Sequence, residues 1–273
     1  YEMPLNKIVG SNIDDVYTVK GQHQHIVEEI KNKGYVENLE EVFKTSNGKE
    51  FTALLSVTPI TYKSVDSYIG MVTDITKQKV IENEIREVHK HTRDSIEYAA
   101  LIQGALIPDN TLFRNYFKDY FVIWHPKDTV GGDIYLFNEL RNADECLLMF
   151  IDCTGHGVPG AFVTMLVKAV EREIVSIIKN NKDMVVSPAW VMQYFNKTLK
   201  KLLKQENKES LSNAGWDGGI VYYNRKKQIL KFAGAETPLF YVDTDGSFNT
   251  IKGNRYSVGY KKCAMDYEYK ETI

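Results

Sequence analysis

The sequence predicts an α+β protein built on antiparallel sheets, preceded by a smaller mixed segment and a long helix. Three observations predict this class. Residues 116–154 hold three strand-like stretches, two amphipathic helical stretches follow before residue 205, and short alternating stretches separated by turns fill the rest. Strands, then two helices, then more strands indicate a layered α+β domain without βαβ alternation.

The composition is that of an ordinary soluble protein, and its length allows two domains. The 273 residues carry 34 basic and 36 acidic side chains, so charge gives no reason to expect nucleic acid as a partner. Cys146, Cys153 and Cys263 are an odd, widely spaced set without a CxxC pattern. They indicate neither a disulfide framework nor a cysteine zinc site, and they fit a reducing cytoplasm.

No stretch is predicted to enter a membrane. The longest apolar run, Cys146–Ile151, is far short of the ~18 residues that a spanning helix needs, and the N-terminus has no signal-peptide pattern. We therefore expect a cytoplasmic location and no membrane contact for these residues. Both ends look cut, because Tyr267 and Tyr269 indicate an unfinished strand just before Ile273. A membrane tether elsewhere in a longer protein stays open.

The first segment, 1–74, is predicted to hold a helix at Gln24–Lys33 and a small sheet. Asn47-Gly48 between two alternating stretches is a strong hairpin signal. The expected strands are Val36–Thr45, Phe51–Ile60 and Tyr68–Val72. The residues from Gly70 to Thr76 resemble the end of a PAS sensor domain, whose final strand leads into a signalling helix. That resemblance implies the C-terminal part of a PAS domain and identifies no ligand.

Residues 75–107 are predicted to form one helical linker. Asp74 is a plausible N-cap, and Pro108 ends the stretch. Side chains recur at alternating steps of four and three, namely Ile81, Ile85, Val88, Thr92, Ser95, Ala99, Ile102 and Leu106. This heptad seam predicts a parallel coiled coil, and hence a homodimer through the linker. The alternative is an exposed connector packed on its own domain, because the middle of the seam is polar or small.

Residues 108–273 are predicted to form the main domain. The expected strands are Tyr120–Trp124, Asp133–Leu140, Cys146–Thr154, Gly219–Asn224, Gln228–Ala233, Leu239–Asp243 and Phe248–Lys252. Two helices are expected after the third strand, one starting near Pro159 and one running from Ser187 to Lys204. The first should bury a face made of Phe162, Met165, Leu166, Ala169, Val170, Ile174, Ile177 and Ile178.

Two aspartates are predicted to face each other across a hairpin of the second and third of these strands. A loop centred between Asn142 and Ala143 places Asp133 directly opposite Asp152. The same register forms a continuous apolar ladder of Ile134 with Ile151, Tyr135 with Phe150 and Leu136 with Met149. Directly paired residues place their Cβ atoms ~4.5–5.5 Å apart, so the two carboxylates should meet.

The chemistry of this pair indicates a metal site. Two carboxylates this close repel unless they share a proton or a cation, and oxygen ligands alone favour Mg²⁺ or Mn²⁺ over zinc. Gly131 and Gly132 before the first aspartate allow close backbone approach. After the second, Gly155-His156-Gly157 is a flexible turn that opens a helix, whose amides can face a phosphate. The plainer interpretation of His156 is a turn and helix-start residue.

The motifs around the two aspartates resemble those of bacterial PPM-type phosphatases related to sporulation protein E. Gly131-Gly132-Asp133 matches the family's GGD, and the stretch from Asp152 to Ala161 matches its D-x-[ST]-G-H-G-x-[PG]-[AG] segment. Residues 232–239 resemble the family's AGxxPxL strand. The resemblance spans residues 107–273 and implies an α/β/β/α sandwich of antiparallel sheets.

The same resemblance implies a set of metal ligands. Asp133 and Asp152 would hold two Mn²⁺ or Mg²⁺ ions and carry the catalysis, and the backbone carbonyl of Cys153 would add a ligand. Asp217 matches a further acidic position, although a turn residue is its plainer interpretation. The family also has a later Ser-Asp-Gly segment with another ligand. The chain ends before it, so we expect an incomplete centre and an inactive fragment as one outcome.

The implied reaction is hydrolysis of phosphoserine or phosphothreonine on a protein, with no covalent intermediate and no role for the Cys153 thiol. The resemblance also implies bacterial signal transduction, with a STAS-domain anti-sigma-factor antagonist as substrate and the PAS segment as control. The main alternative is a non-catalytic signalling scaffold with an inactive phosphatase fold. A diguanylate cyclase is disfavoured because Ile134 and Tyr135 follow the GGD, and a histidine kinase because no glycine-rich ATP-binding boxes follow the linker histidines.

Overall fold

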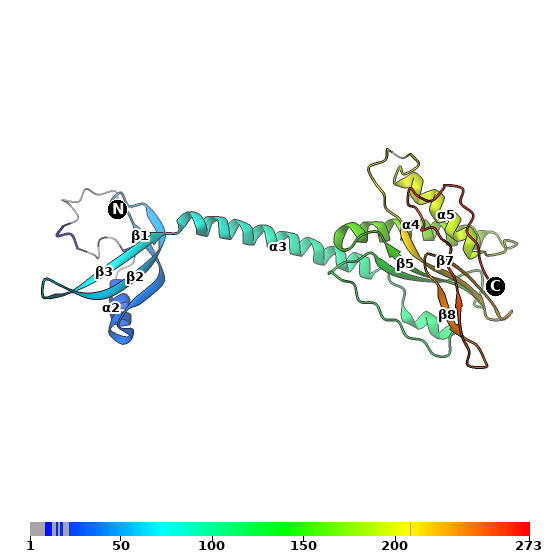
Figure 1. The fold of residues 1–273 in the computed structure, drawn as a ribbon, viewed down its shortest axis with the longest axis horizontal. Coiled ribbons are helices and arrows are strands. Elements are labelled where there is room, and N and C mark those ends of the chain that lie inside the picture. Colours follow the sequence, from blue (N-terminus) through cyan, green and yellow to red (C-terminus); the bar gives the residue numbers. More distant parts are fainter. Residues whose placement is uncertain (1–8, 13–14, 16, 19–21, 208) are drawn as a thin grey trace. The chain divides into compact units, whose positions relative to one another are not determined.

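The computed structural model describes residues 9–12, 15, 17–18, 22–207 and 209–273. The chain divides into two compact units, Tyr1–Thr92 and Arg93–Ile273 (Figure 1). The division falls inside one long helix, whose residues belong to the predicted linker. Part of the predicted segment 1–74 lies outside the described residues.

The first unit is a three-stranded antiparallel sheet with one helix. Its elements are α2 (Gln22–Lys33), β1 (Val36–Lys44), β2 (Glu50–Tyr62) and β3 (Val65–Asp74), and the strands pair in the order β1-β2-β3. The predicted turn closes β1 on β2, with the Gly48 amide donating to the Thr45 carbonyl at 2.9 Å. Ile26 and Ile30 of α2 pack with Phe43 and Leu55 of the sheet. The predicted helix and strands are confirmed, whereas the PAS resemblance stays a prediction.

Helix α3 (Thr76–Gly104) covers most of the predicted linker. Its start is stabilised as expected, because Asp74 Oδ1 accepts a hydrogen bond from the Thr76 amide at 2.8 Å. The seam residues Ile81, Ile85 and Val88 are exposed. Pairing of two such helices stays a prediction.

The second unit is a four-stranded antiparallel sheet with two helices on one face (Figure 1). Its strands pair in chain order and are β4 (Asp133–Glu139), β5 (Glu145–Cys153), β6 (Trp216–Asn224) and β7 (Ile229–Ala235). The helices are α4 (Gly157–Asn180) and α5 (Pro188–Leu202), and a final hairpin is formed by β8 (Leu239–Val242) and β9 (Phe248–Ile251). These elements confirm the predicted α+β class.

The main core lies between the sheet and the two helices. Strands β4 and β5 direct every second side chain into it, and Leu136 and Met149 are fully buried there. Trp216 of β6 meets Phe195 of α5 edge to face, with ring centres 5.4 Å apart. On the other face a smaller cluster gathers around Phe113 of the 3-10 helix η2 (Asn110–Asn115). One face of the sheet is therefore sealed by helices, and the other is only partly covered.

The predicted strand Tyr120–Trp124 is wrong. These residues form no strand. Tyr120, Val122 and Trp124 pack on the cluster around Phe113, while the residues between them are exposed. The alternating pattern therefore reflects a segment that lies over the sheet, with one side facing in, and not pairing with a neighbouring strand. The predicted unfinished strand at the C-terminal end is seen only as one antiparallel bridge, in which Thr272 and Phe232 of β7 exchange backbone hydrogen bonds of 2.9 Å. Tyr267, before it, packs edge to face on Tyr269.

The predicted buried face of α4 is wrong for the first half of the helix. Phe162 is 63% exposed, while Val163 and Val167 are buried. The second half, from Val170 to Ile178, agrees with the prediction. The helix starts at Gly157, and its first turns carry apolar residues on two faces. The apolar pattern therefore did not identify which of the two faces is buried. Among the described residues, no helix combines the length and the apolar character that crossing a membrane requires.

Candidate metal centre

The two predicted aspartates lie directly opposite each other. In the antiparallel pair of β4 and β5, Asp133 is the partner of Asp152. The predicted ladder is also confirmed, with Ile134 opposite Ile151 and the next two pairs in the same register. Since the turn and the apolar ladder agree on one register, the carboxylates are placed by local sequence alone.

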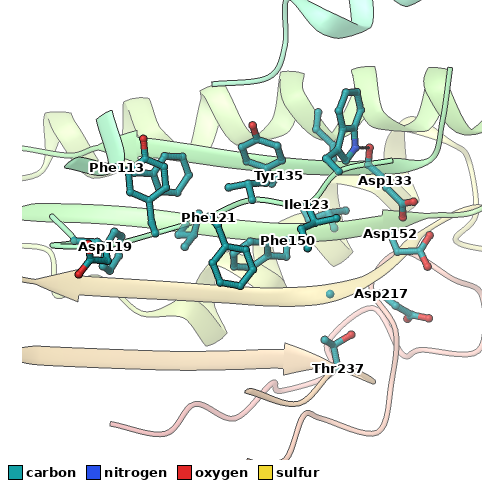
Figure 2. Close-up of a pocket in the computed structure, with 18 residues that line it drawn as sticks. Phe113, Asp119, Phe121, Ile123, Asp133, Tyr135, Phe150, Asp152, Asp217 and Thr237 are labelled. Carbon is teal, nitrogen blue, oxygen red and sulfur yellow. Dashed lines mark hydrogen bonds between the residues drawn. The ribbon is translucent and has the colours of Figure 1, made fainter. Parts of the chain in front are cut away.

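A third aspartate joins the row from the next strand. Asp217 of β6 is the direct partner of Asp152 in the pairing of β5 with β6. Directly paired side chains share a face of the sheet, and this face carries Tyr135 and lies opposite the one covered by α4 and α5. Figure 2 shows the carboxylates of Asp133, Asp152 and Asp217 in that order at one end of the sheet. The turn interpretation of Asp217 is therefore wrong, because the residue lies within a strand.

Tight backbone packing holds the two predicted glycine motifs together. A Cβ on Gly132 would lie 2.5 Å from the Gly155 carbonyl oxygen and 2.6 Å from that of Cys153. The Cys153 amide donates to the Gly132 carbonyl at 3.0 Å. The GGD segment and the Gly155 turn pack so closely at this glycine crossing that position 132 requires a glycine. The same packing places the Cys153 carbonyl beside β4.

His156 has a partner that the sequence did not indicate. Its Nδ1 lies 2.7 Å from Oδ2 of Asp128, and both side chains are largely exposed. His156 precedes the first residue of α4 and makes no side-chain capping bond to the helix. Asp128 comes from the loop before Gly131, and no motif or spacing marked it. The imidazole of His156 is therefore oriented by the Asp128 carboxylate, so His156 is more than a turn residue.

The end of α3 is anchored to the same region through Gln103, which the sequence also did not indicate. Its buried side-chain amide donates from Nε2 to the Gly131 carbonyl at 2.7 Å and accepts from the Gly131 amide at 3.0 Å. The same Nε2 lies 3.0 Å from Oγ1 of Thr164 in α4. Gly131 lies two residues before Asp133, so the helix end fixes the start of the aspartate strand.

The charges at this end of the sheet are poorly compensated within the protein. Partial burial, then the negative charges of Asp133 and Asp217, raise the pKa of Asp152. Oδ1 of Asp217 is buried without a hydrogen-bond partner among the described residues. Burial raises the pKa of the Cys153 thiol well above its usual range, which leaves this thiol unreactive. A cation would satisfy these oxygens, and Cys153 can contribute its carbonyl alone.

The donor set fits part of a two-ion centre. Within the described part of the chain, no group of three or more His, Cys, Asp or Glu side chains converges to hold one ion. The three aspartates instead form a row, and together with the Cys153 carbonyl they would supply oxygen ligands to the ions. Their ligands are all oxygen atoms, which matches Mg²⁺ or Mn²⁺.

Two cavities meet at Asp133 and Asp152. A groove of about 800 Å³ runs along the face opposite α4 and α5 and is lined mainly by apolar residues, including Phe121, Ile123 and Phe150 (Figure 2). A smaller cavity of about 290 Å³ shares these two aspartates and is also lined by Lys127, the glycine turn and His156. The two carboxylates therefore border both an apolar groove and a small polar cavity.

Comparison with known proteins identifies the fold. No protein-family model and no curated protein matches the chain. Among solved structures, the SiaA PP2C domain of Pseudomonas aeruginosa is similar, with 32% identity, a TM-score of 0.55 and coverage of 68% of this chain and 67% of that one. A SpoIIE fragment from Bacillus subtilis with its PP2C phosphatase domain matches at 12% identity and a TM-score of 0.38, over 92% of this chain and 66% of its own.

RsbX in complex with magnesium matches at 12% identity and a TM-score of 0.37, over 52% of this chain and 59% of its own. The SiaA domain combines substantial sequence identity with coverage of two thirds of both chains. The chain belongs to the PP2C, or PPM-type, phosphatase family.

Proposed function

We propose that the protein is a metal-dependent serine/threonine phosphatase that acts on a phosphorylated protein in bacterial signalling. The observation that carries the proposal is the row of Asp133, Asp152 and Asp217, with the unpartnered oxygen of Asp217. The membership of the PP2C family supports the reaction class.

In this proposal Asp133 and Asp152 hold two Mn²⁺ or Mg²⁺ ions, with the Cys153 carbonyl and Asp217 as further ligands. Such ions would supply an activated water and neutralise the phosphoryl oxygens. The turn Gly155-His156-Gly157 borders the polar cavity, where its backbone amides can orient the phosphoryl group. Asp128 holds the imidazole of His156 at the rim of that cavity.

A protein substrate is supported by the apolar groove beside the aspartates. Phe121 and Ile123 are exposed along it, and such a surface suits a folded partner better than a small polar ester. We propose a STAS-domain anti-sigma-factor antagonist as that partner, in the cytoplasm. Control would come from the first unit, the proposed PAS segment, through α3.

The reaction is tested with a phosphoserine protein and Mn²⁺. Asp152→Asn should abolish turnover, because it removes one charge from the centre of the row. The matched control is Asp183→Asn, since Asp183 is exposed and lies away from the row. Equal turnover by Asp152→Asn and the unchanged chain would refute the mechanism.

The proposed homodimer is tested separately. The exposed seam residues Ile81, Ile85 and Val88 predict a dimer mass by light scattering at micromolar concentration. Ile85→Lys should shift the mass toward the monomer, while Lys90→Ala, outside the seam, should not. A monomer mass for the unchanged chain contradicts the dimer.

The second candidate function is a non-catalytic signalling scaffold. It is favoured by the lack of a converging group of three metal-binding side chains in the described residues. A scaffold should bind its partner equally well with and without Mn²⁺ and should leave the phosphoserine intact. Turnover that depends on Mn²⁺ excludes it.

A further inference from the structure

The strand ends that carry Asp152 and Asp217 are tied together by a threonine. Thr154 lies two residues after Asp152, and Gly215 lies two residues before Asp217. The Thr154 amide donates to the Gly215 carbonyl at 2.9 Å, and the Gly215 amide donates to the Thr154 hydroxyl oxygen at 2.8 Å. The Thr154 side chain therefore extends the pairing of β5 with β6 beyond the aspartates.

Tyr260 completes this arrangement from a distant part of the sequence. Its hydroxyl oxygen lies 2.6 Å from Oγ1 of Thr154. A threonine hydroxyl has one proton and two acceptor sites. The Thr154 hydroxyl accepts from the Gly215 amide, and its one proton can go to the Tyr260 hydroxyl oxygen or to the Gly215 carbonyl, 3.0 Å away. Tyr260 is thus a direct hydrogen-bond partner of the Thr154 hydroxyl.

The ring of Tyr260 is also held against the same strand. Val258 and Trp216 exchange backbone hydrogen bonds of 2.9 Å in both directions, which brings Tyr260 alongside the start of β6. A Cβ on Gly215 would lie 2.6 Å from Cδ2 of Tyr260 and would collide with the Val258 carbonyl. The glycine at position 215 is therefore required because the Val258 carbonyl and the ring of Tyr260 both lie against it.

We propose that Tyr260 is a positioning residue for the metal centre. Acting through Thr154 and Gly215, it fixes the spacing of the Asp152 and Asp217 carboxylates without touching an ion or the substrate. The inference rests on the proposed metal-dependent function. Groups that orient metal ligands from outside the ligand set matter for affinity, and losing one typically weakens binding about 10–100-fold.

The test measures the Mn²⁺ affinity of the 273-residue chain by titration calorimetry. Tyr260→Phe keeps the ring and removes the hydroxyl, so it should weaken binding about 10–100-fold. Thr154→Val should give a similar loss, whereas Thr154→Ser keeps a hydroxyl and should retain the affinity. The matched control is Tyr194→Phe, which removes a tyrosine hydrogen bond of 2.6 Å to Glu173, away from the aspartates. It should leave the affinity unchanged.

Thermal unfolding without metal separates positioning from folding. Tyr260→Phe and Tyr194→Phe should lower Tm by similar small amounts, so that only the Mn²⁺ affinity distinguishes them. Full affinity in Tyr260→Phe, or an equal loss in Tyr194→Phe, overturns the inference. A Mn²⁺ site that depends on Asp152 but not on Tyr260 overturns the inference alone. If Asp152→Asn binds Mn²⁺ as the unchanged chain does, the proposed function fails, and the inference fails with it.

Discussion

The two faces of the sheet β4–β7 are built from alternating residues of the same strands, yet they differ in almost every property. The face under α4 and α5 is apolar and closed, with Leu136, Met149 and Trp216 fully buried. The opposite face carries the three aspartates at one end and leaves Phe150 45% exposed. One face therefore supplies stability, and the other keeps its polar groups open for chemistry.

This difference explains how like charges can sit together in a stable fold. The aspartates lie at the strand ends, where the Gly155 turn packs on Gly132 and holds the backbone in place. Their side chains take no part in the core. Mutations on the closed face should therefore change stability, and mutations at the aspartate end should change metal binding more than stability. The following predictions test that division.

The largest loss of stability is expected in the closed core. Phe195 is fully buried and meets Trp216 edge to face, so Phe195→Ala should lower the free energy of unfolding by about 3–5 kcal/mol. Phe162→Ala on the neighbouring helix should cost within about 0.5 kcal/mol, because Phe162 is exposed. Denaturant unfolding measures both. Equal losses would contradict the assignment of the α4 faces.

A substitution at the glycine crossing, where Gly132 packs on Gly155 and Cys153, should change both the stability and the metal binding of the protein. Gly132→Ala places a methyl group against the carbonyls of Gly155 and Cys153, so we expect a cost of about 3 kcal/mol and a loss of Mn²⁺ binding. Gly70→Ala is the control, since an added Cβ there meets nothing within 4 Å. Chemical denaturation and calorimetry give the two quantities. Unchanged Mn²⁺ binding in Gly132→Ala would show that the packing at Gly132 does not hold the metal centre.

A carboxylate joins the helix layer to the sheet and should make the closed face sensitive to pH. Burial opposes ionisation of Glu271, but hydrogen bonds from Ser187, Ala189 and Lys231 outweigh it and lower the pKa of Glu271. A lowered folded-state pKa adds stability above the unfolded value of about 4.3 and loses it as the pH falls through the folded value.

Glu271→Gln should therefore cost about 1.5 kcal/mol at pH 7 and progressively less below about pH 4. Unfolding curves from pH 7 to pH 3 measure the gap between the two proteins. A gap that is constant over this range would show that the charge of Glu271 does not contribute.

The smallest effect is expected on the open face. Phe150 is paired with Tyr135 but remains 45% exposed, so Phe150→Ala should cost less than about 1 kcal/mol. The same variant should weaken binding of a phosphoprotein substrate if the apolar groove is its docking surface. Titration with the phosphoprotein measures that loss, and a stability cost as large as that of Phe195→Ala would contradict the contrast between the faces.

Local sequence signals predicted the Asp133 and Asp152 pair, because a short turn and an apolar ladder fix one register. Asp217 was reached only through a resemblance, since the pairing of β5 with β6 joins residues more than sixty positions apart and no turn connects them. Asp128, Gln103 and Tyr260 gave no signal, because their roles depend on contacts between distant segments. Side-chain alternation also misled, since residues 120–124 alternate through packing over the sheet and not through pairing.

The most direct test of the central claim is the position of Mn²⁺ in a crystal soaked with MnCl₂, located by anomalous scattering at the manganese edge. The carboxylate row predicts a peak between the carboxylates of Asp133 and Asp152, and the peak should disappear in Asp152→Asn. A well-ordered crystal with no peak there, or with manganese bound only elsewhere, would contradict the assignment of this sheet end as a metal centre.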